Sequence, residues 1–75
     1  MTICSLVVYS KPENTPSVEA AVAGMEAVEI HATDPAGKLV VTVDHPDRSF
    51  CSEQIMKFHS VPGVINTALV YEYTE

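Results

Sequence analysis

Ile3-Cys4-Ser5-Leu6-Val7-Val8-Tyr9 is the stretch that decides the fold. Its residues are almost wholly apolar and rich in valine, a pattern typical of a central strand that is covered on at least one face and partly on the other. Two prolines and an asparagine interrupt this pattern between Ser10 and Pro16. We therefore predict a sheet built around residues 3–9, with the chain leaving the sheet after Ser10.

A helix is predicted to follow this interruption, from about Pro16 to Ala23. Thr15 stands directly before Pro16, and threonine caps free backbone N–H groups while proline suits the first helical position. Gly24 is a natural helix terminator. The apolar residues follow the i, i+3, i+4, i+7 spacing of one buried helix face and are Val18, Ala21, Val22 and Met25.

Two strands joined by a turn come next. Residues 26–31 alternate between apolar and polar side chains, with Val28 and Ile30 on the apolar side, as in a half-buried strand. Residues 34–37 read Asp-Pro-Ala-Gly, which supplies turn residues. The strand pattern resumes from Lys38 to Asp44, so these segments are predicted to form a hairpin.

The last third of the chain predicts a second helix and a final strand. Asp47 is placed to cap the helix, and Cys51, Ile55 and Phe58 fall at i, i+4, i+7. Val-Pro-Gly-Val at residues 61–64 ends it, and a last strand is predicted from Val64 to Tyr73.

The order strand, helix, strand, strand, helix, strand is that of a ferredoxin-like α+β sandwich, formed by residues 1–75 as a single domain. Right-handed crossovers place the first and third strands centrally, in the antiparallel order 4-1-3-2. Both helices then cover one face of the sheet. The other face has no element left to cover it.

Strand periodicity assigns side chains to the uncovered face. Tyr71 is expected to point toward the helices and Glu72 away from them. The residues expected on the uncovered face are Ser5, Val7, Tyr9, Ala27, Glu29, His31, Lys38, Val40, Thr42, Ala68, Val70 and Glu72. The apolar members form a centre with acidic and aromatic residues around it, which suits a docking platform. Strand propensity alone is the alternative explanation for the valines, and it stays open.

The net charge and the N-terminal sequence indicate what kind of partner the protein binds and in which compartment it is found. Ten acidic residues against four basic ones give a net charge of -6, which disfavours nucleic acid and anionic membranes and favours a basic partner. The N-terminal stretch lacks a positive region and is too short to span a membrane, so we expect a cytoplasmic protein without stable membrane insertion. Cys4 and Cys51 form no CxxC motif and are expected to be buried thiols in a reducing compartment.

No motif predicts catalysis or a metal site. The three histidines lack a neighbouring nucleophile and orienting group, and a zinc site needs about four clustered ligands. Asp34, Asp44 and Asp47 are expected to cap turns and a helix start. We therefore expect no enzyme, no cofactor and no catalytic or metal-ligating residue. A small-molecule-sensing regulatory domain of the same fold remains an alternative, because fold alone does not decide function.

Several segments resemble the NapD family. Four segments are similar to NapD in order and spacing: Cys4-Ser5-Leu6-Val7-Val8, the hairpin return Ala36-Gly37-Lys38-Leu39-Val40-Val41, Val61-Pro62-Gly63-Val64, and Ala68-Leu69-Val70-Tyr71. The resemblance covers nearly the whole chain. It implies a cytoplasmic chaperone for the twin-arginine signal peptide of the periplasmic nitrate reductase catalytic subunit, which delays export until the molybdenum cofactor is inserted.

This implied partner agrees with the residue-based expectation, because the peptide carries paired arginines and an apolar stretch. We expect Val7, Val40, Ala68 and Val70 to supply apolar contacts. Glu29 and Glu72 are expected to meet arginines, and Tyr9 to stack on a guanidinium. A helical peptide lying across the sheet is favoured over an added edge strand. The exposed apolar face would also support a weak homodimer.

Overall fold

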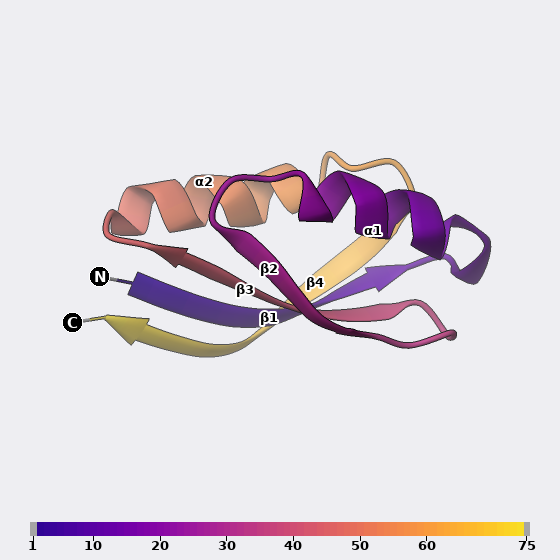
Figure 1. The fold of residues 1–75 in the computed structure, drawn as a ribbon, viewed down its shortest axis with the longest axis horizontal. Helices are drawn as coiled ribbons and strands as arrows, with labels where there is room; N and C mark the ends of the chain where they lie inside the picture. The colour runs from indigo at the N-terminus through magenta and orange to yellow at the C-terminus, as the bar shows by residue number, and fades with distance from the viewer. Residues whose placement is uncertain (1, 75) are drawn as a thin grey trace.

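The computed structural model describes residues 2–74 and contains a four-stranded sheet with two helices on one face (Figure 1). The elements in chain order are β1 (Thr2–Ser10), a short 3-10 turn η1 (Pro12–Asn14), α1 (Thr15–Ala23), β2 (Val28–Thr33), β3 (Lys38–His45), α2 (Arg48–Phe58) and β4 (Val64–Thr74).

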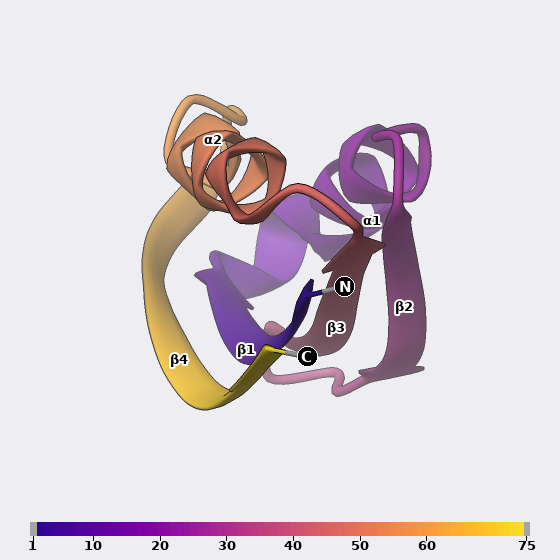
Figure 2. The same ribbon diagram turned by 90° about the vertical axis from the view of Figure 1, so that its left-hand side faces the viewer.

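The sheet has the order β2-β3-β1-β4, and every neighbouring pair is antiparallel. This is the predicted 4-1-3-2 order, so the α+β ferredoxin-like fold is confirmed. Figure 2 shows both helices above the sheet and the strands curving beneath them, with β4 bending most strongly. The face opposite the helices, which we call the outer face, is covered by no element among residues 2–74.

The core lies between the helices and the inner face of the sheet. Side chains of β1 alternate strictly between buried and half-buried, as expected for a central strand with a packed inner face. Both cysteines are free and buried, as predicted. The buried apolar residues are Cys4, Leu6, Val8, Val18, Val22, Leu39, Val41, Val43, Cys51 and Phe58.

The helix starts differ in how they are capped. Asp47 caps α2 as predicted, since its carboxylate accepts the Ser49 N–H at 2.8 Å. Thr15 does not cap α1, and that prediction is wrong. The η1 turn brings the chain into helical conformation early, so Thr15 is itself the first residue of α1, and its hydroxyl donates to the Lys11 carbonyl at 3.3 Å.

The turn between β2 and β3 is held against the end of β1. The Asp34 carboxylate accepts the Ala36 N–H at 2.6 Å, which is the turn role predicted for it. The Ser10 N–H donates to the Gly37 carbonyl at 2.7 Å. Gly37 has φ +104°, and a Cβ there would lie 2.2 Å from the Ser10 carbonyl oxygen. Only glycine allows this approach.

An extra residue in β4 changes which side chains reach the outer face. Ser5 pairs with Tyr71, but the next residue of β1, Leu6, pairs with Leu69, so Val70 is a β-bulge. Beyond the bulge the alternation is reversed relative to an uninterrupted strand. The predicted faces of Tyr71 and Glu72 are therefore wrong: Tyr71 pairs with outward-facing Ser5, and Glu72 pairs with buried Cys4.

A second irregularity lies near the start of β4. Ser10 pairs with Val64 while Tyr9 pairs with Asn66, which leaves Ile65 as an extra residue. Period-two counting along β4 places Ile65 on the same face as Leu69, toward the helices, yet 62% of its surface is exposed. The start of β4 is therefore packed less closely against the helices than strand periodicity predicts.

Candidate functional site

The outer face is built around β1, whose alternate residues Ile3, Ser5, Val7 and Tyr9 are half-buried there. On one side, Val7 pairs with Val40 and Ser5 with Thr42; on the other side, Val7 pairs with Ala68. The predicted outer positions Val7, Tyr9, Val40 and Ala68 are therefore brought together on adjacent strands. Two depressions lie on this face, one at each end.

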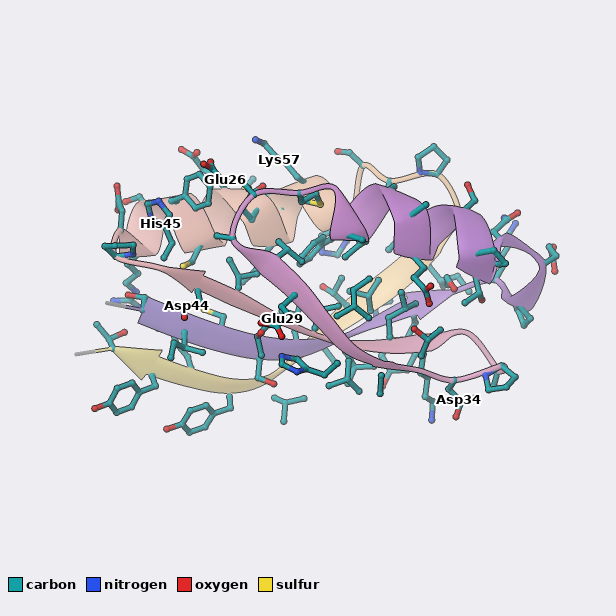
Figure 3. All side chains as sticks on the ribbon, viewed as in Figure 1. Glu26, Glu29, Asp34, Asp44, His45 and Lys57 are labelled. Atoms are coloured by element: carbon teal, nitrogen blue, oxygen red, sulfur yellow. The ribbon has the colours of Figure 1, made fainter. Side chains whose placement is uncertain are left out.

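The first, which we call the acidic depression, has a volume of about 440 Å³. Glu29 of β2 pairs with Thr42 of β3, and Asp44 pairs with Ile3 of β1. In Figure 3, Glu29 and Asp44 lie at the level of the sheet, with Asp44 toward the end where the chain termini emerge. The lining residues are Ile3, Ala27, Val28, Glu29, His31, Thr42 and Asp44.

Among residues 2–74, two carboxylates and no Lys or Arg line the acidic depression, so its charge is negative. An imidazole, that of His31, also lines it and has its Nε2 at 2.8 Å from the Thr42 hydroxyl. Asp44 was expected to cap a turn or helix start. It lies instead within β3, paired with Ile3, so its predicted structural role is wrong.

The second, the apolar depression, has a volume of about 360 Å³ and lies at the hairpin end. Val7 and Val40, which are a cross-strand pair, line it together with Pro35 of the turn. Figure 3 places Asp34 at this end of the molecule, opposite to Asp44. The lining residues are Val7, Ala32, Thr33, Asp34, Pro35, Lys38 and Val40.

Tyrosines lie at both ends of the outer face. Tyr9 pairs with Lys38 and Asn66, at the hairpin end, and is thus separated from Glu29. Tyr71 and Tyr73 pair with Ser5 and Ile3, which places them at the acidic end, and they are 55% and 45% exposed. Tyr71 and Tyr73 therefore share an end of the outer face with Asp44, although β1 lies between them and β3, whereas Tyr9 lies at the other end.

Glu72 is not part of the outer face. Its carboxylate lies 3.3 Å from the Arg48 guanidinium at the start of α2, and the Cys4 thiol lies 4.0 Å from its other oxygen. Sequence reasoning selected Glu72 and missed Tyr71 and Tyr73 for one reason, the bulge at Val70. Asp44, in contrast, was within reach of sequence reasoning, since period two places it on the same face as Thr42 and Val40.

The histidines make structural contacts. His45 stacks on Phe50 with ring centroids 3.9 Å apart, and its Nδ1 accepts the Asp47 N–H at 3.0 Å. His59 lies 3.0 Å from the Thr67 hydroxyl. Within residues 2–74, no three His, Cys, Asp or Glu side chains are grouped as a metal site, and neither helix is long and apolar enough to cross a membrane.

Comparison with known proteins gives a consistent result. A family model described as "NapD protein" matches residues 1–75. The chain is 31% identical over 74 residues to Chaperone NapD of Escherichia coli strain K12 and to that of Shigella flexneri, covering 97% of this chain and 85% of each relative. The solution structure of the E. coli Tat proofreading chaperone protein NapD superposes with a TM-score of 0.87 at 31% identity, covering 97% of this chain and 78% of the other. This chain therefore belongs to the NapD family.

Proposed function

We propose that this protein is a cytoplasmic chaperone, and not an enzyme, that binds a twin-arginine signal peptide on its outer face. The client would be the catalytic subunit of a periplasmic nitrate reductase, held back from export until its molybdenum cofactor is in place. The similarity to the Escherichia coli relative, a Tat proofreading chaperone, supports this proposal.

The main observation behind the proposal is that the uncovered face has both an acidic and an apolar depression. A twin-arginine signal peptide has paired guanidinium groups followed by an apolar stretch. Glu29 and Asp44 offer carboxylates to guanidinium groups, which are geometrically suited to them. Val7 and Val40 offer apolar surface a short distance away. A metabolite-sized ligand would need only one of these surfaces.

Two further residues of β4 would enlarge the apolar part of the site. Ala68 pairs with Val7 on the side away from Val40, so it widens the apolar surface across β1. Val70, at the bulge, is 66% exposed. Tyr9 closes the hairpin end of this surface, where it would contact the apolar stretch of the peptide. Tyr71 and Tyr73, at the acidic end of the face, would stack on guanidinium groups.

The openness of the face sets the expected strength of binding. Ion pairs between partly solvated groups contribute about 0.2–1 kcal/mol each, so neither arginine alone would hold the peptide. The apolar contacts must supply much of the remaining binding free energy. Such a chaperone would release its client readily, which suits a step that delays export and does not prevent it.

Calorimetric titration of the protein with the signal peptide tests the proposal. We expect saturable heat with the natural peptide, and an affinity lowered roughly 2- to 30-fold when both arginines are replaced by glutamine, since two charge pairs are lost. Absence of binding by the natural peptide would refute the proposed function. Equal affinity for both peptides would refute the charge pairing.

Matched protein variants locate the site. Asp44→Asn removes one charge from the acidic depression, and Glu53→Gln removes one from the exposed surface of α2. We expect the first to weaken binding of the natural peptide and the second to leave it unchanged. Glu72→Gln should resemble the control, because Glu72 already faces Arg48. A larger loss from Glu72→Gln than from Asp44→Asn would place the peptide elsewhere.

A further inference from the structure

The outer positions of a single strand, β3, change from acidic to basic along its length. Asp44, Thr42, Val40 and Lys38 occupy alternate positions, each paired with an outer-face residue of β1. At the Asp44 end the acidic depression adds Glu29 and, within the described chain, contains no lysine or arginine. At the Lys38 end the apolar depression contains the carboxylate of Asp34, which already accepts the Ala36 N–H. The face therefore has two chemically distinct ends.

From this asymmetry we infer that the peptide binds in one direction only, an inference that rests on the proposed function. Its arginines lie over the acidic depression, and the apolar stretch that follows them extends toward the hairpin between β2 and β3. The bound peptide then runs in the direction of β1 and opposite to β3. Asp44 is the residue that fixes this direction, because it marks the acidic end of the central pair of strands.

A helical peptide would favour the same direction independently of its side chains. The N-terminus of a helix carries a partial positive charge and its C-terminus a partial negative one. In the inferred direction the positive end lies over Glu29 and Asp44, and the negative end lies toward Lys38. The reverse direction would place the negative end of the helix over Glu29 and Asp44. The arginines and the helix dipole therefore select the same arrangement.

The spacing of the two depressions predicts which peptide residues are in contact. Asp44 and Val40 are four residues apart in β3, which corresponds to about 14 Å at roughly 3.4 Å per residue. A helix rises about 1.5 Å per residue, so its apolar contact falls about nine residues beyond the arginine that meets Asp44. An extended peptide would place that contact only about four residues beyond the arginine.

Paramagnetic NMR tests the direction without altering the protein. The natural peptide is prepared with a nitroxide at its N-terminal end and, separately, at its C-terminal end. We expect the N-terminal label to broaden the amide signals of Thr42 and Asp44, and the C-terminal label to broaden those of Gly37 and Lys38. The opposite pattern would overturn the inferred direction, as would equal broadening of both ends by each label.

Double-mutant cycles provide a second measurement. Asp44→Asn should weaken binding of the natural peptide about two- to fivefold, and should have a smaller effect once both arginines are glutamine, because only the helix dipole then faces Asp44. Val40→Thr keeps a β-branched side chain of similar size and should couple to an alanine substitution about nine residues beyond the arginines. It should not couple to the arginines themselves.

The outcomes separate the two proposals. If the natural peptide does not bind at all, the proposed function fails. If it binds with normal affinity but Val40→Thr couples to the arginines, or Asp44→Asn couples to the apolar stretch, the direction is wrong while the function stands. Coupling of Val40→Thr to a residue about four positions beyond the arginines would keep the direction and replace the helical peptide with an extended one.

Discussion

Two buried thiols make the stability of the folded protein depend on pH. Burial raises the pKa of Cys4 above its ordinary value of 9.0, and the nearby Glu72 carboxylate raises it further. Burial also raises the pKa of the Cys51 thiol, although the His45 backbone hydrogen bond opposes the shift. Both thiols therefore resist ionisation while the protein is folded.

This direction predicts how stability changes in alkali. Below pH 9 the thiols are protonated in the folded and unfolded chains, and their contribution to stability is fully present. As the pH rises above 9.0, the unfolded thiols ionise first, so the free energy of unfolding falls until the folded pKa is reached. The loss is at most about 1.4 kcal/mol per thiol per pH unit.

Urea unfolding at pH 7, 8.5 and 10 measures this loss. The doubly substituted Cys4→Ala, Cys51→Ala chain is the control, because tyrosine and lysine titration affects it equally. We expect a steeper alkaline decline in the unsubstituted protein than in the control. Parallel declines would show that the thiols are not differentially protonated.

Most of the exposed large apolar residues lie in one element, the edge strand β4. Five of the seven large apolar residues that are exposed among residues 2–74 lie in β4: Ile65, Leu69, Val70, Tyr71 and Tyr73. Its only charged residue within the described chain, Glu72, is paired with Arg48. Edge strands of this composition pair with other strands unless something blocks them. The two bulges of β4 limit such pairing and do not abolish it.

We therefore predict weak self-association through β4, and predict that Leu69→Lys reduces it. Lysine on an edge strand carries its charge into any second strand that approaches. Sedimentation equilibrium at rising protein concentration measures the effect, with Met56→Lys on α2 as the control, since Met56 is 70% exposed. If the protein is a monomer at all concentrations, the predicted homodimer does not exist. If both substitutions have equal effects, the dimer interface does not involve β4.

How much of the fold was predictable depends on how clearly each element is marked in the sequence. The alternation in β1 and the i, i+4, i+7 spacing of Cys51, Ile55 and Phe58 each allow one interpretation, and the structure agrees. Asp47 and Gly24 mark helix ends by well-understood hydrogen-bonding and backbone preferences. These features identify the elements, and their order with right-handed crossovers then predicts the topology.

The bulge at Val70 could not be predicted in the same way. From Leu69 to Tyr73 nearly every residue favours a strand on either face, and no glycine or proline marks the extra residue. Period-two counting therefore continues through the bulge and exchanges the faces of Tyr71 and Glu72. This error is confined to the part of the site that β4 supplies. Val7 and Val40 rest on the regular pairing of β1 with β3, and Glu29 pairs with Thr42 ahead of the irregularity that β2 has between Ile30 and Ala32.

The net charge of the whole molecule affects how fast a charged peptide associates with it. At a formal charge of -6, the protein attracts a cationic peptide before any contact forms, and dissolved salt screens this attraction. We predict that raising the salt concentration from about 20 mM to 300 mM slows association markedly and changes dissociation little. Stopped-flow measurements would test this. The peptide with both arginines replaced by glutamine should show a weaker salt dependence, and an equally strong one would argue against steering by those arginines.

The pairing of Thr2 with Thr74 offers a way to engineer this protein. Both ends of the described chain emerge at the same end of the sheet, where Ile3 and Tyr73 border the acidic end of the outer face (Figure 1). A client peptide fused to either end through a short flexible linker would experience a local concentration in the millimolar range. Such a single-chain fusion would hold the proposed complex together long enough for its structure to be determined.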